Sequence, residues 1–402
     1  MSTVVTNESW FSRIGGAIKG LLIGAILTVV SVPILFWNEG RAVYTAKGLE
    51  EGAGAVVTTD STDVLPENEG KFVHVTGQTT TEDILRDDDF GIEFNGIRLN
   101  RKAEMYQWVE HKETKSKKKL GGGKKKTTTY TYDMQWSDRL VSSGSFHKKS
   151  GHENPTEMLL QSKSSEATNV SLGEHKLPGS LIGQIRQSES VEIEKERIDK
   201  SLIDNIIIQN EGNQSIAYYR SNEPYDGTPK LGDTRVTFTA TPTTIVSLMS
   251  KQSGDTFQPY VTQFDTQLNM LQVGTVAPEA MIAKAEADNA RLTWILRGLG
   301  AGMMFFGFTM IFRPLSVLAD VIPIFGSFVG FGAGVIAFLL AGAGSLITIS
   351  IAWLFYRPIL GITLLVIAAV LLGFAFMRMR SGSRKSYAAD ETNFDNPNAL
   401  SS

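Results

Sequence analysis

Long apolar runs divide the chain into stretches suited to a membrane and stretches typical of soluble protein. The first run, residues 20–37, carries no charge and approaches the ~20 residues that cross a bilayer core. Three more runs follow late in the chain, at residues 294–312, 327–355 and 359–377. The pattern predicts four transmembrane helices. Residues 38–293 form a large insertion between the first helix and the second.

A cleaved signal peptide is the alternative interpretation of the first run. The apolar core of a signal peptide is normally shorter, and small residues follow it at the cleavage site. Here Trp37, Asn38, Glu39 and Gly40 follow the run. This boundary favours a retained transmembrane helix.

Charges next to the runs predict how the chain is oriented. Arg13 and Lys19 precede the first run, and four basic residues follow the last one within residues 378–385. Because positive charge favours the cytoplasmic side, both ends are expected there. Three tryptophans then fall at the outer boundary, where amphipathic rings prefer to lie: Trp37, Trp294 and Trp353. The predicted segments outside the spans are a cytoplasmic tail (1–19), an extracytoplasmic domain (38–293), a cytoplasmic loop (313–326) and a cytoplasmic C-terminal tail (378–402).

The inserted domain is predicted to be rich in strands. Phe72–Gln78 alternates apolar and polar residues, as half-buried strands do. Met105–Val109 and Tyr130–Trp136 are expected to form a hairpin, joined by a flexible, solvated, lysine-rich loop, Lys112–Lys126. The alternative interpretation of this loop is a basic patch that touches lipid headgroups. Further strands are expected at residues 205–208, 215–220, 234–240 and 244–248, and helices at 155–160, 181–187 and 278–291. The last helix has no breaker before Trp294, so it is expected to continue into the second span. The fold class is therefore an integral membrane α+β protein.

Glycines at four-residue spacing mark helix faces on which two backbones can approach closely. They are Gly16, Gly20 and Gly24 near the first span, Gly298 and Gly302 in the second, and Gly326, Gly330 and Gly334 at the third. One interpretation is packing within a single four-helix bundle. The other is that one stripe joins neighbouring subunits of a homo-oligomer.

Candidate catalytic and metal-binding groups are few. The chain has no cysteine, five histidines and a net charge of −3. His147, His152 and Glu153 lack the spacing of a zinc-binding HExxH helix, and residues 87–89 (three aspartates) lack the spacing of a calcium loop. We therefore expect no enzyme, no cofactor, no metal and no nucleic-acid partner. Acidic residues are also absent from the spans, which argues against a transporter, pump or channel.

Polar residues gather at the predicted outer membrane boundary. They are Asn38, Glu39, Arg41, Arg297 and Arg357. A charge at this depth needs a partner, so we expect a structural collar in which Glu39 pairs with Arg357 or with Arg297. The alternative is a binding site for a lipid headgroup or a protein partner.

Six segments, in order along the chain, resemble elements of the transmembrane protein 43 (LUMA) family. They are WNEGRA at 37–42, PENEGKFVH at 66–74, EMYQWVE at 104–110, GHENP at 151–155, GDTRV at 232–236 and WLFYRP at 353–358. The resemblance covers nearly the whole chain. The chain departs from the animal sequences of this family in the loop KSKKKLGGGKKK and in both tails.

The resemblance implies four spans, a large lumenal domain and a role in self-association and the organisation of membrane protein complexes. Animal members lie in the endoplasmic reticulum and inner nuclear membrane, with emerin and lamins among their partners. A bacterial member would lie in the inner membrane and organise membrane proteins, membrane lipids or lipid-linked assemblies. We therefore expect a self-associating membrane scaffold. The alternative is an extracytoplasmic sensor or lipid-handling module that acts through the helix entering the second span.

Overall fold

The structure, a computed structural model, describes residues 1–221, 223–363, 366 and 370. The chain forms two compact units. The strand-rich unit comprises residues 1–17, 44–290 and 315–329. The helical unit comprises residues 18–43, 291–314 and those from 330 onwards. Each unit is described separately below.

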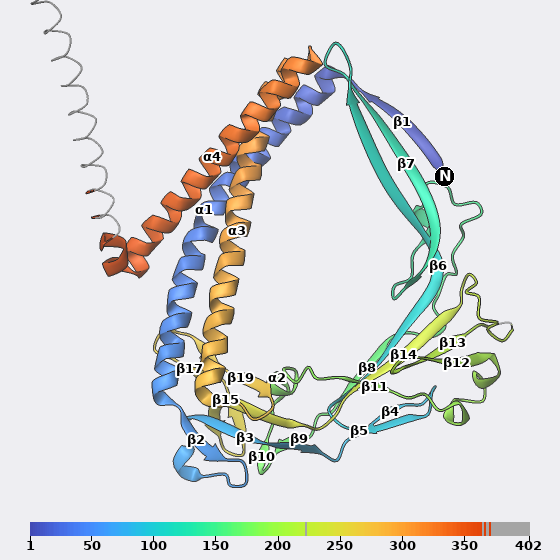
Figure 1. The fold of residues 1–402 in the computed structure, drawn as a ribbon, viewed down its shortest axis with the longest axis vertical. Helices are drawn as coiled ribbons and strands as arrows, with labels where there is room; N and C mark the ends of the chain where they lie inside the picture. The colour runs from blue at the N-terminus through green and yellow to red at the C-terminus, as the bar shows by residue number, and fades with distance from the viewer. Residues whose placement is uncertain (222, 364–365, 367–369, 371–402) are drawn as a thin grey trace, which may run out of the picture. The chain divides into compact units, whose positions relative to one another are not determined.

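Three helices in the described part of the chain are long and apolar enough to cross a membrane. They are α1 (Trp10–Ala55), α3 (Pro278–Ala319) and α4 (Pro323–Tyr356), labelled in Figure 1. Each contains one of the first three predicted spans, so an α+β membrane protein is supported. Residues 358–363 are helical, but most of the fourth predicted span (359–377) and all of the C-terminal tail (378–402) lie outside the described residues.

The helices extend beyond the apolar runs. As predicted, α3 begins at Pro278 and continues without a break through Trp294. Helix α1 continues past Trp37 to Ala55, although the sequence indicated a boundary there. Glycines and charged residues in this extension resemble a loop by composition, but helix propensity is only a weak guide once tertiary packing contributes.

Within the described residues, the strand-rich unit contains two main sheets. The larger has the order β1-β7-β6-β14-β13-β12, with β11 paired to β14 and β8 to β6. Its strands are β1 Ser2–Glu8, β6 Arg98–Lys118, β7 Lys124–Ser137, β8 Lys163–Glu166, β11 Glu189–Val191, β12 Ile206–Glu211, β13 Gln214–Tyr219 and β14 Thr234–Thr241.

The second sheet has the order β19-β15-β16-β10-β9-β3-β2, and β15 also pairs with β3. Its strands are β2 Val57–Asp60, β3 Phe72–Thr81, β9 Val170–Leu172, β10 His175–Lys176, β15 Ile245–Ser253, β16 Thr256–Gln258 and β19 Met270–Val273. Two small ladders complete the unit, β4 (Ile84–Asp87) with β5 (Ile92–Asn95) and β17 (Tyr260–Val261) with β18 (Gln267–Leu268).

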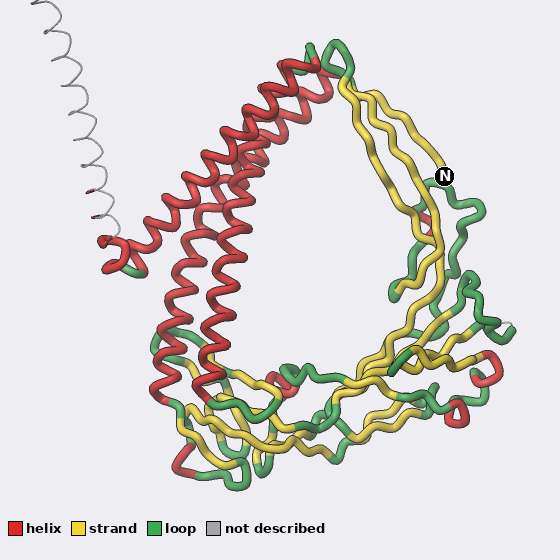
Figure 2. Tube along the Cα trace, viewed as in Figure 1, coloured by secondary structure: helices red, strands yellow, loops and turns green. Residues whose placement is uncertain are grey.

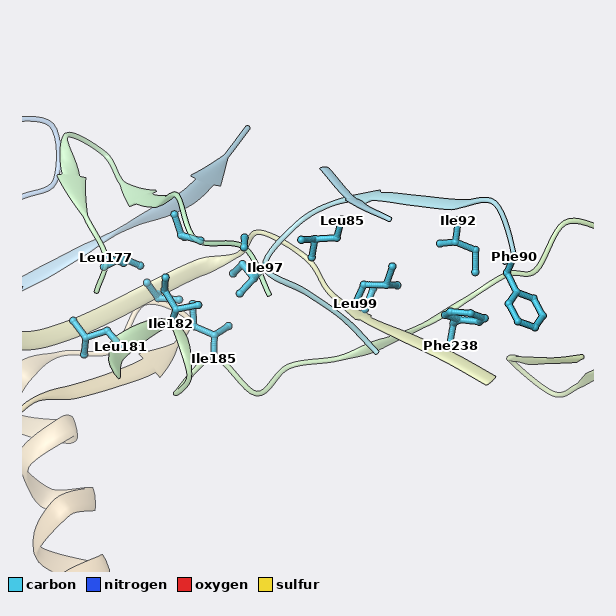
Figure 3. Close-up of a cluster of buried hydrophobic side chains, with 14 of the residues drawn as sticks. Leu85, Phe90, Ile92, Ile97, Leu99, Leu177, Leu181, Ile182, Ile185 and Phe238 are labelled. Atoms are coloured by element: carbon cyan, nitrogen blue, oxygen red, sulfur yellow. The ribbon is translucent and has the colours of Figure 1, made fainter. Parts of the chain in front are cut away.

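One hydrophobic core serves both sheets. Val75 of β3 and Leu248 of β15 belong to the same buried cluster as Leu99 of β6 and Phe238 of β14. Phe90 packs edge-on against Phe238, with 5.2 Å between ring centroids (Figure 3). Burying a side chain of this size contributes about 1.5–3 kcal/mol, so the shared cluster makes the two sheets one folding unit.

Most of the predicted strands are present, but two local expectations are wrong. Residues 155–160 form no helix, and in place of a helix at 181–187 there is a single turn, α2 (Gly179–Ile182). Both segments contribute buried residues, Leu160 in the first and Leu181 and Ile185 in the second, to the core of the strand-rich unit. Packing, rather than a helical period, therefore determines their conformation.

The hairpin extends much further than the sequence indicated. Most of the predicted lysine-rich loop, Lys112–Lys126, is strand, and only residues 119–123 connect β6 to β7. Strand β1 adds a third strand beside β7, with Ser2 opposite Tyr130 and Glu8 opposite Lys124. Strands β1, β7 and β6 run side by side in Figures 1 and 2. Pairing on both sides of β7 explains how so polar a segment becomes extended.

This three-stranded ladder bears directly on the predicted topology. It joins residues 2–8 to residues 124–130, although the charge pattern assigned the first segment to the cytoplasm and the second to the opposite side. In a hydrocarbon layer every backbone group needs an internal partner, and open sheet edges are not tolerated. A bilayer that separates the two segments and a ladder that joins them cannot both describe the chain.

Candidate functional site

The predicted polar collar lies in the helical unit, where α1, α3 and α4 each contribute residues. Asn38, Glu39 and Arg41 lie within one turn of α1, and Arg297 lies on α3. Asn38 and Glu39 are almost completely buried, with 0% and 1% of their surface exposed. Groups this polar are stable at such depth only when their hydrogen-bonding capacity is used.

Glu39 is held by two residues from two different helices. Arg297 donates from Nε and a terminal nitrogen to the two carboxylate oxygens, at 2.6 and 2.7 Å. The indole Nε1 of Trp353, on α4, donates to Oε2 at 2.8 Å. The Arg297 guanidinium also lies over the rings of Trp294 and Trp353, with 4.7 and 5.8 Å to the ring centroids. A bidentate pair reinforced by aromatic faces is among the strongest polar contacts a protein makes.

A second set of hydrogen bonds ties α1 to α3 next to this pair. The Asn38 amide donates to the backbone oxygen of Thr293 at 3.1 Å. Arg41 donates to the Thr293 hydroxyl at 2.9 Å and to the Asn38 side-chain oxygen at 3.3 Å. Together with Glu39, which binds Arg297, Asn38 and Arg41 thus hold α3 at two positions one helical turn apart.

The glycine of the same α1 segment has a packing role. A Cβ atom on Gly40 would lie 2.6 Å from the ring of Tyr356 on α4. The segments NEGR and WLFY, far apart in the sequence, therefore meet twice, through Glu39 with Trp353 and through Gly40 with Tyr356.

The structure shows which of the two predicted partners binds Glu39. The carboxylate is bound by Arg297, whereas Arg357 is exposed. Of the two predicted alternatives, the structure therefore contains the pairing with Arg297. Sequence alone could not distinguish them, because both arginines fall at the same predicted depth. Thr293 and Trp353, which complete the collar, were not predicted as hydrogen-bonding partners.

The predicted glycine stripes separate into packed and open positions. A Cβ on Gly24 would lie 2.5 Å from the backbone oxygen of Gly307 on α3, so this glycine holds α1 close to α3. Gly20 is in ordinary contact with Met310, and Gly326 packs tightly against Asp320. Gly330 is half-buried on α4. The open positions, where an added Cβ would meet nothing within 4 Å, are Gly16, Gly298, Gly302 and Gly334.

In the strand-rich unit, the segments EMYQWVE and GHENP also meet. Asn154 accepts from the backbone N–H of Trp108 at 2.8 Å and donates to its carbonyl at 2.9 Å. His152 stacks on Tyr132, with 4.0 Å between ring centroids, and lies edge-on to Trp108. His152 is therefore part of a clamp that holds the loop after β7 against the hairpin. Among the described residues, no three acidic or histidine side chains cluster closely enough to hold a metal ion.

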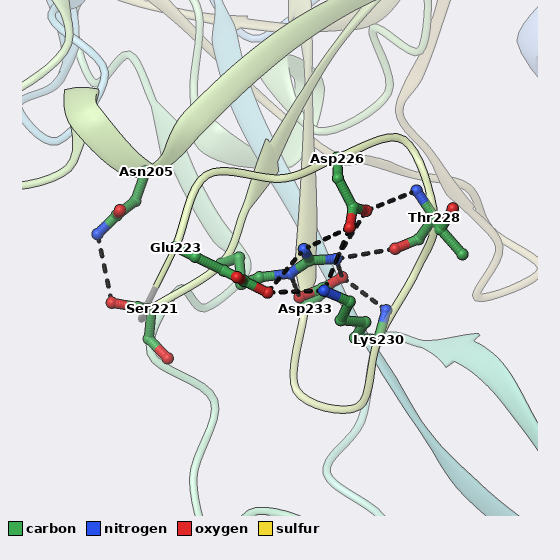
Figure 4. A network of polar contacts seen from close by, with 8 residues as sticks. Asn205, Ser221, Glu223, Asp226, Thr228, Lys230 and Asp233 are labelled. Carbon is green, nitrogen blue, oxygen red and sulfur yellow. Dashed lines mark hydrogen bonds and ion pairs between the residues drawn. The ribbon is translucent and has the colours of Figure 1, made fainter.

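A network around Arg220 was not predicted. This buried guanidinium donates to both oxygens of Asp233, each at 2.8 Å, and to the backbone oxygen of Thr228 at 2.8 Å. The hydrogen bonds with Asp233 raise the pKa of Arg220. Figure 4 shows Glu223, Asp226 and Lys230 gathered around the same guanidinium group, with Lys230 paired to both acids. The network closes the loop between β13 and β14 and gives Asp233 of the GDTRV segment a structural role.

A second buried ion cluster in the strand-rich unit was also missed. Asp320, in the turn between α3 and α4, is 1% exposed and pairs with both Arg13 and Lys118. These three residues come from regions separated by more than a hundred positions in the sequence. No local pattern indicates that they meet.

Comparison with known proteins places the chain in a family. A family model described as transmembrane protein 43 matches residues 105–358. Transmembrane protein 43 of Mus musculus is 33% identical over 88% of this chain and 90% of its own length. The Homo sapiens protein is 32% identical over 88% of both chains, and the Drosophila melanogaster homolog is 27% identical over 87% of this chain and 92% of its own. No solved structure matches. The chain belongs to the transmembrane protein 43 family.

Proposed function

We propose that this protein is a non-enzymatic membrane scaffold that self-associates through its helices and organises other membrane components. The observation that carries the proposal is the set of open glycines on α3. Gly24 is occupied by contacts within the chain, but Gly298 and Gly302 have nothing within 4 Å of an added Cβ. Four-residue glycine spacing on an open face suits close approach by a helix of another subunit.

Exposed apolar side chains support the same proposal. Large residues on the helices, such as Leu299 and Phe306 near the open glycines, are more than half exposed. Lipid and a neighbouring helix both satisfy such residues, whereas only a neighbouring helix makes use of an adjacent backbone groove. The membrane is the bacterial inner membrane in a prokaryote, and the endoplasmic reticulum or inner nuclear membrane in a eukaryote.

The test is the mass of the purified full-length protein in nanodiscs. We expect an oligomer that Gly298→Leu together with Gly302→Leu converts to monomer, because leucine fills the groove. Gly54→Leu is the matched control, since Gly54 is also open but lies beyond the apolar run. A strictly monomeric wild-type particle, or an oligomer unaffected by the double change, contradicts self-association through α3.

A sensor or lipid-handling module is the second candidate. It is favoured by the continuity of α3, which begins within the strand-rich unit at Pro278 and becomes a candidate span without a break. Lipid mass spectrometry of the purified protein separates the two candidates. Selective enrichment of one lipid class supports the module, and a lipid profile equal to the bulk membrane removes its main support.

A further inference from the structure

The tip of the β6–β7 hairpin concentrates positive charge beyond what its fold requires. Residues 112–126 contain eight lysines and one glutamate. The strand register places Lys118 opposite Lys124 and Lys117 opposite Lys125. Like charges directly opposite each other destabilise a strand pair. An anionic surface in contact with the tip would remove this repulsion.

Only some of these lysines are neutralised within the protein. Lys118 pairs with Asp320 at 2.5 Å, Lys126 with Glu8 at 2.8 Å, and Lys115 with Glu113 at 3.1 Å. Lys117 and Lys125 are exposed. Within the described part of the chain, neither lysine pairs with an acidic side chain. Lys119 is also exposed, and it donates to the uncharged Asn7 side chain.

Contacts within the strand-rich unit tie the tip to the turn between two apolar helices. Gly121 N–H donates to the Val321 oxygen at 3.0 Å, and Trp10 Nε1 donates to the Val317 oxygen at 2.9 Å. Only residues 320–322 separate α3 from α4, and both helices are candidate spans. So short a connection between two crossing helices emerges at the bilayer surface, and in the state that keeps the ladder the tip that it contacts lies at the same surface.

Apolar side chains accompany the lysines. Leu120, at the very end of the hairpin, is 85% exposed, and Phe11 on the adjoining turn of α1 is 78% exposed. Ile324 and Phe325 at the start of α4 are also largely exposed. A soluble polyanion such as nucleic acid would account for the lysines but not for these apolar residues. Basic residues beside exposed leucine and phenylalanine are typical of segments that lie in a membrane interface.

We propose that this basic tip, formed by residues 115–126 with the turn at residues 320–325, binds the anionic surface of the bilayer. Lysines 117, 119 and 125 contact lipid phosphates, and Leu120 inserts between headgroups. The proposal stands whether or not the chain self-associates, because it uses no contact between subunits.

The test uses the full-length chain, whose lack of cysteine allows a single label at Ser116→Cys. A polarity-sensitive fluorophore there is followed in nanodiscs of phosphatidylcholine alone or mixed with phosphatidylglycerol. We expect a blue shift only with phosphatidylglycerol, and its reversal by high salt, because screening weakens exposed charges. Identical emission in both lipids overturns the proposal.

Charge variants make the test specific. A lysine near an anionic surface contributes about fivefold to binding, so Lys117→Gln, Lys119→Gln and Lys125→Gln together should weaken the contact on the order of a hundred-fold and abolish the shift. Changing the same lysines to arginine should preserve it. The matched control removes three exposed charges elsewhere, Lys149→Gln, Lys195→Gln and Lys200→Gln, and should leave the shift intact.

Two outcomes of this comparison contradict the proposal. One is a shift that survives in the Lys117, Lys119 and Lys125 glutamine variant while its unfolding temperature matches wild type. The other is a shift in neutral nanodiscs on adding a short oligonucleotide, with none produced by phosphatidylglycerol. The second outcome would assign the tip to a soluble polyanion instead of a membrane.

Discussion

Glu39 illustrates how a single buried carboxylate can determine the packing of three helices. Arg297→Ala leaves it without its bidentate partner, and a buried charge that loses its partner typically destabilises a protein by about 3–5 kcal/mol. We expect a comparable loss in the free energy of unfolding in detergent. Arg357→Ala, at an exposed arginine, should change it by less than about 0.5 kcal/mol.

A double-mutant cycle identifies the pair directly. Glu39→Gln combined with Arg297→Met should recover part of the loss, because no charge is then left unpaired. Equal effects of Arg297→Ala and Arg357→Ala, or strictly additive effects in the cycle, would show that Glu39 and Arg297 do not interact in the folded bundle.

His175 predicts a pH effect in the strand-rich unit. The side chain is completely buried and packs on Phe257, and burial lowers its pKa. The unfolded chain then binds a proton more readily than the folded one. Stability from the neutral ring is therefore complete above about pH 6.5 and declines as the pH falls below it.

Thermal unfolding of the wild type between pH 7.5 and 5 should show this decline, and His175→Gln should flatten it because glutamine does not titrate. His147→Gln, at an exposed histidine, is the control and should leave the slope unchanged. Parallel curves for the wild type and His175→Gln would remove His175 as the cause.

At the scale of elements, the contact between α1 and α3 depends on a glycine. Gly24→Ala places a methyl group against the Gly307 carbonyl and the Met310 side chain, so the helices must separate. Overpacking of this kind usually destabilises by about 1–3 kcal/mol. Gly16→Ala, at an open position of the same helix, should unfold like wild type in detergent. A stable Gly24→Ala protein would mean that α1 and α3 do not approach this closely.

Sequence patterns predicted elements whose own residues show a clear hydrophobic pattern, and they missed those whose polar residues are extended only because of a distant partner. The alternation at Phe72–Gln78 indicates a half-buried strand, and the length of the apolar runs indicates membrane spans, so β3 and the three described spans were identified. Residues 112–118 and 124–126 read as loop because lysine disfavours strands, yet β1 pairs with β7 and makes them extended.

The candidate site shows the same division. The polar residues at the end of the first span could be recognised, because charges in a membrane need partners. Which arginine binds Glu39 depends on helix rotation, which a sequence does not specify. The cluster of Arg13, Lys118 and Asp320 joins three separate regions, so no spacing rule reveals it.

At the scale of the whole molecule, the ladder and the charge-based topology make opposite predictions. Asn7 lies opposite Lys125 in the register, so Asn7→Cys with Lys125→Cys should form a disulfide on oxidation of membranes. Ser2→Cys and Ser116→Cys should then react with an impermeant reagent from the same side. Asn7→Cys with Lys149→Cys, outside the register, is the control for random crosslinking.

Labelling from opposite sides, without the disulfide, would restore the predicted separation of residues 1–19 from residues 38–293. It would also mean that β1 is released from β7 in the membrane. Because the chain contains no natural cysteine, either result is read without background.

The pairing of β1 with β7 also imposes an order on synthesis. Strand β1 leaves the ribosome before α1, and its partner β7 follows only after the whole of α1 and much of the strand-rich unit. At about 5–20 residues per second the first strand waits for several seconds. A helix forms within about a microsecond, so α1 is complete and in contact with the insertion machinery long before the ladder can close. We therefore expect the order of synthesis to influence the choice between ladder and separation, and slowing translation between α1 and β7 should change which of the two states the cell produces.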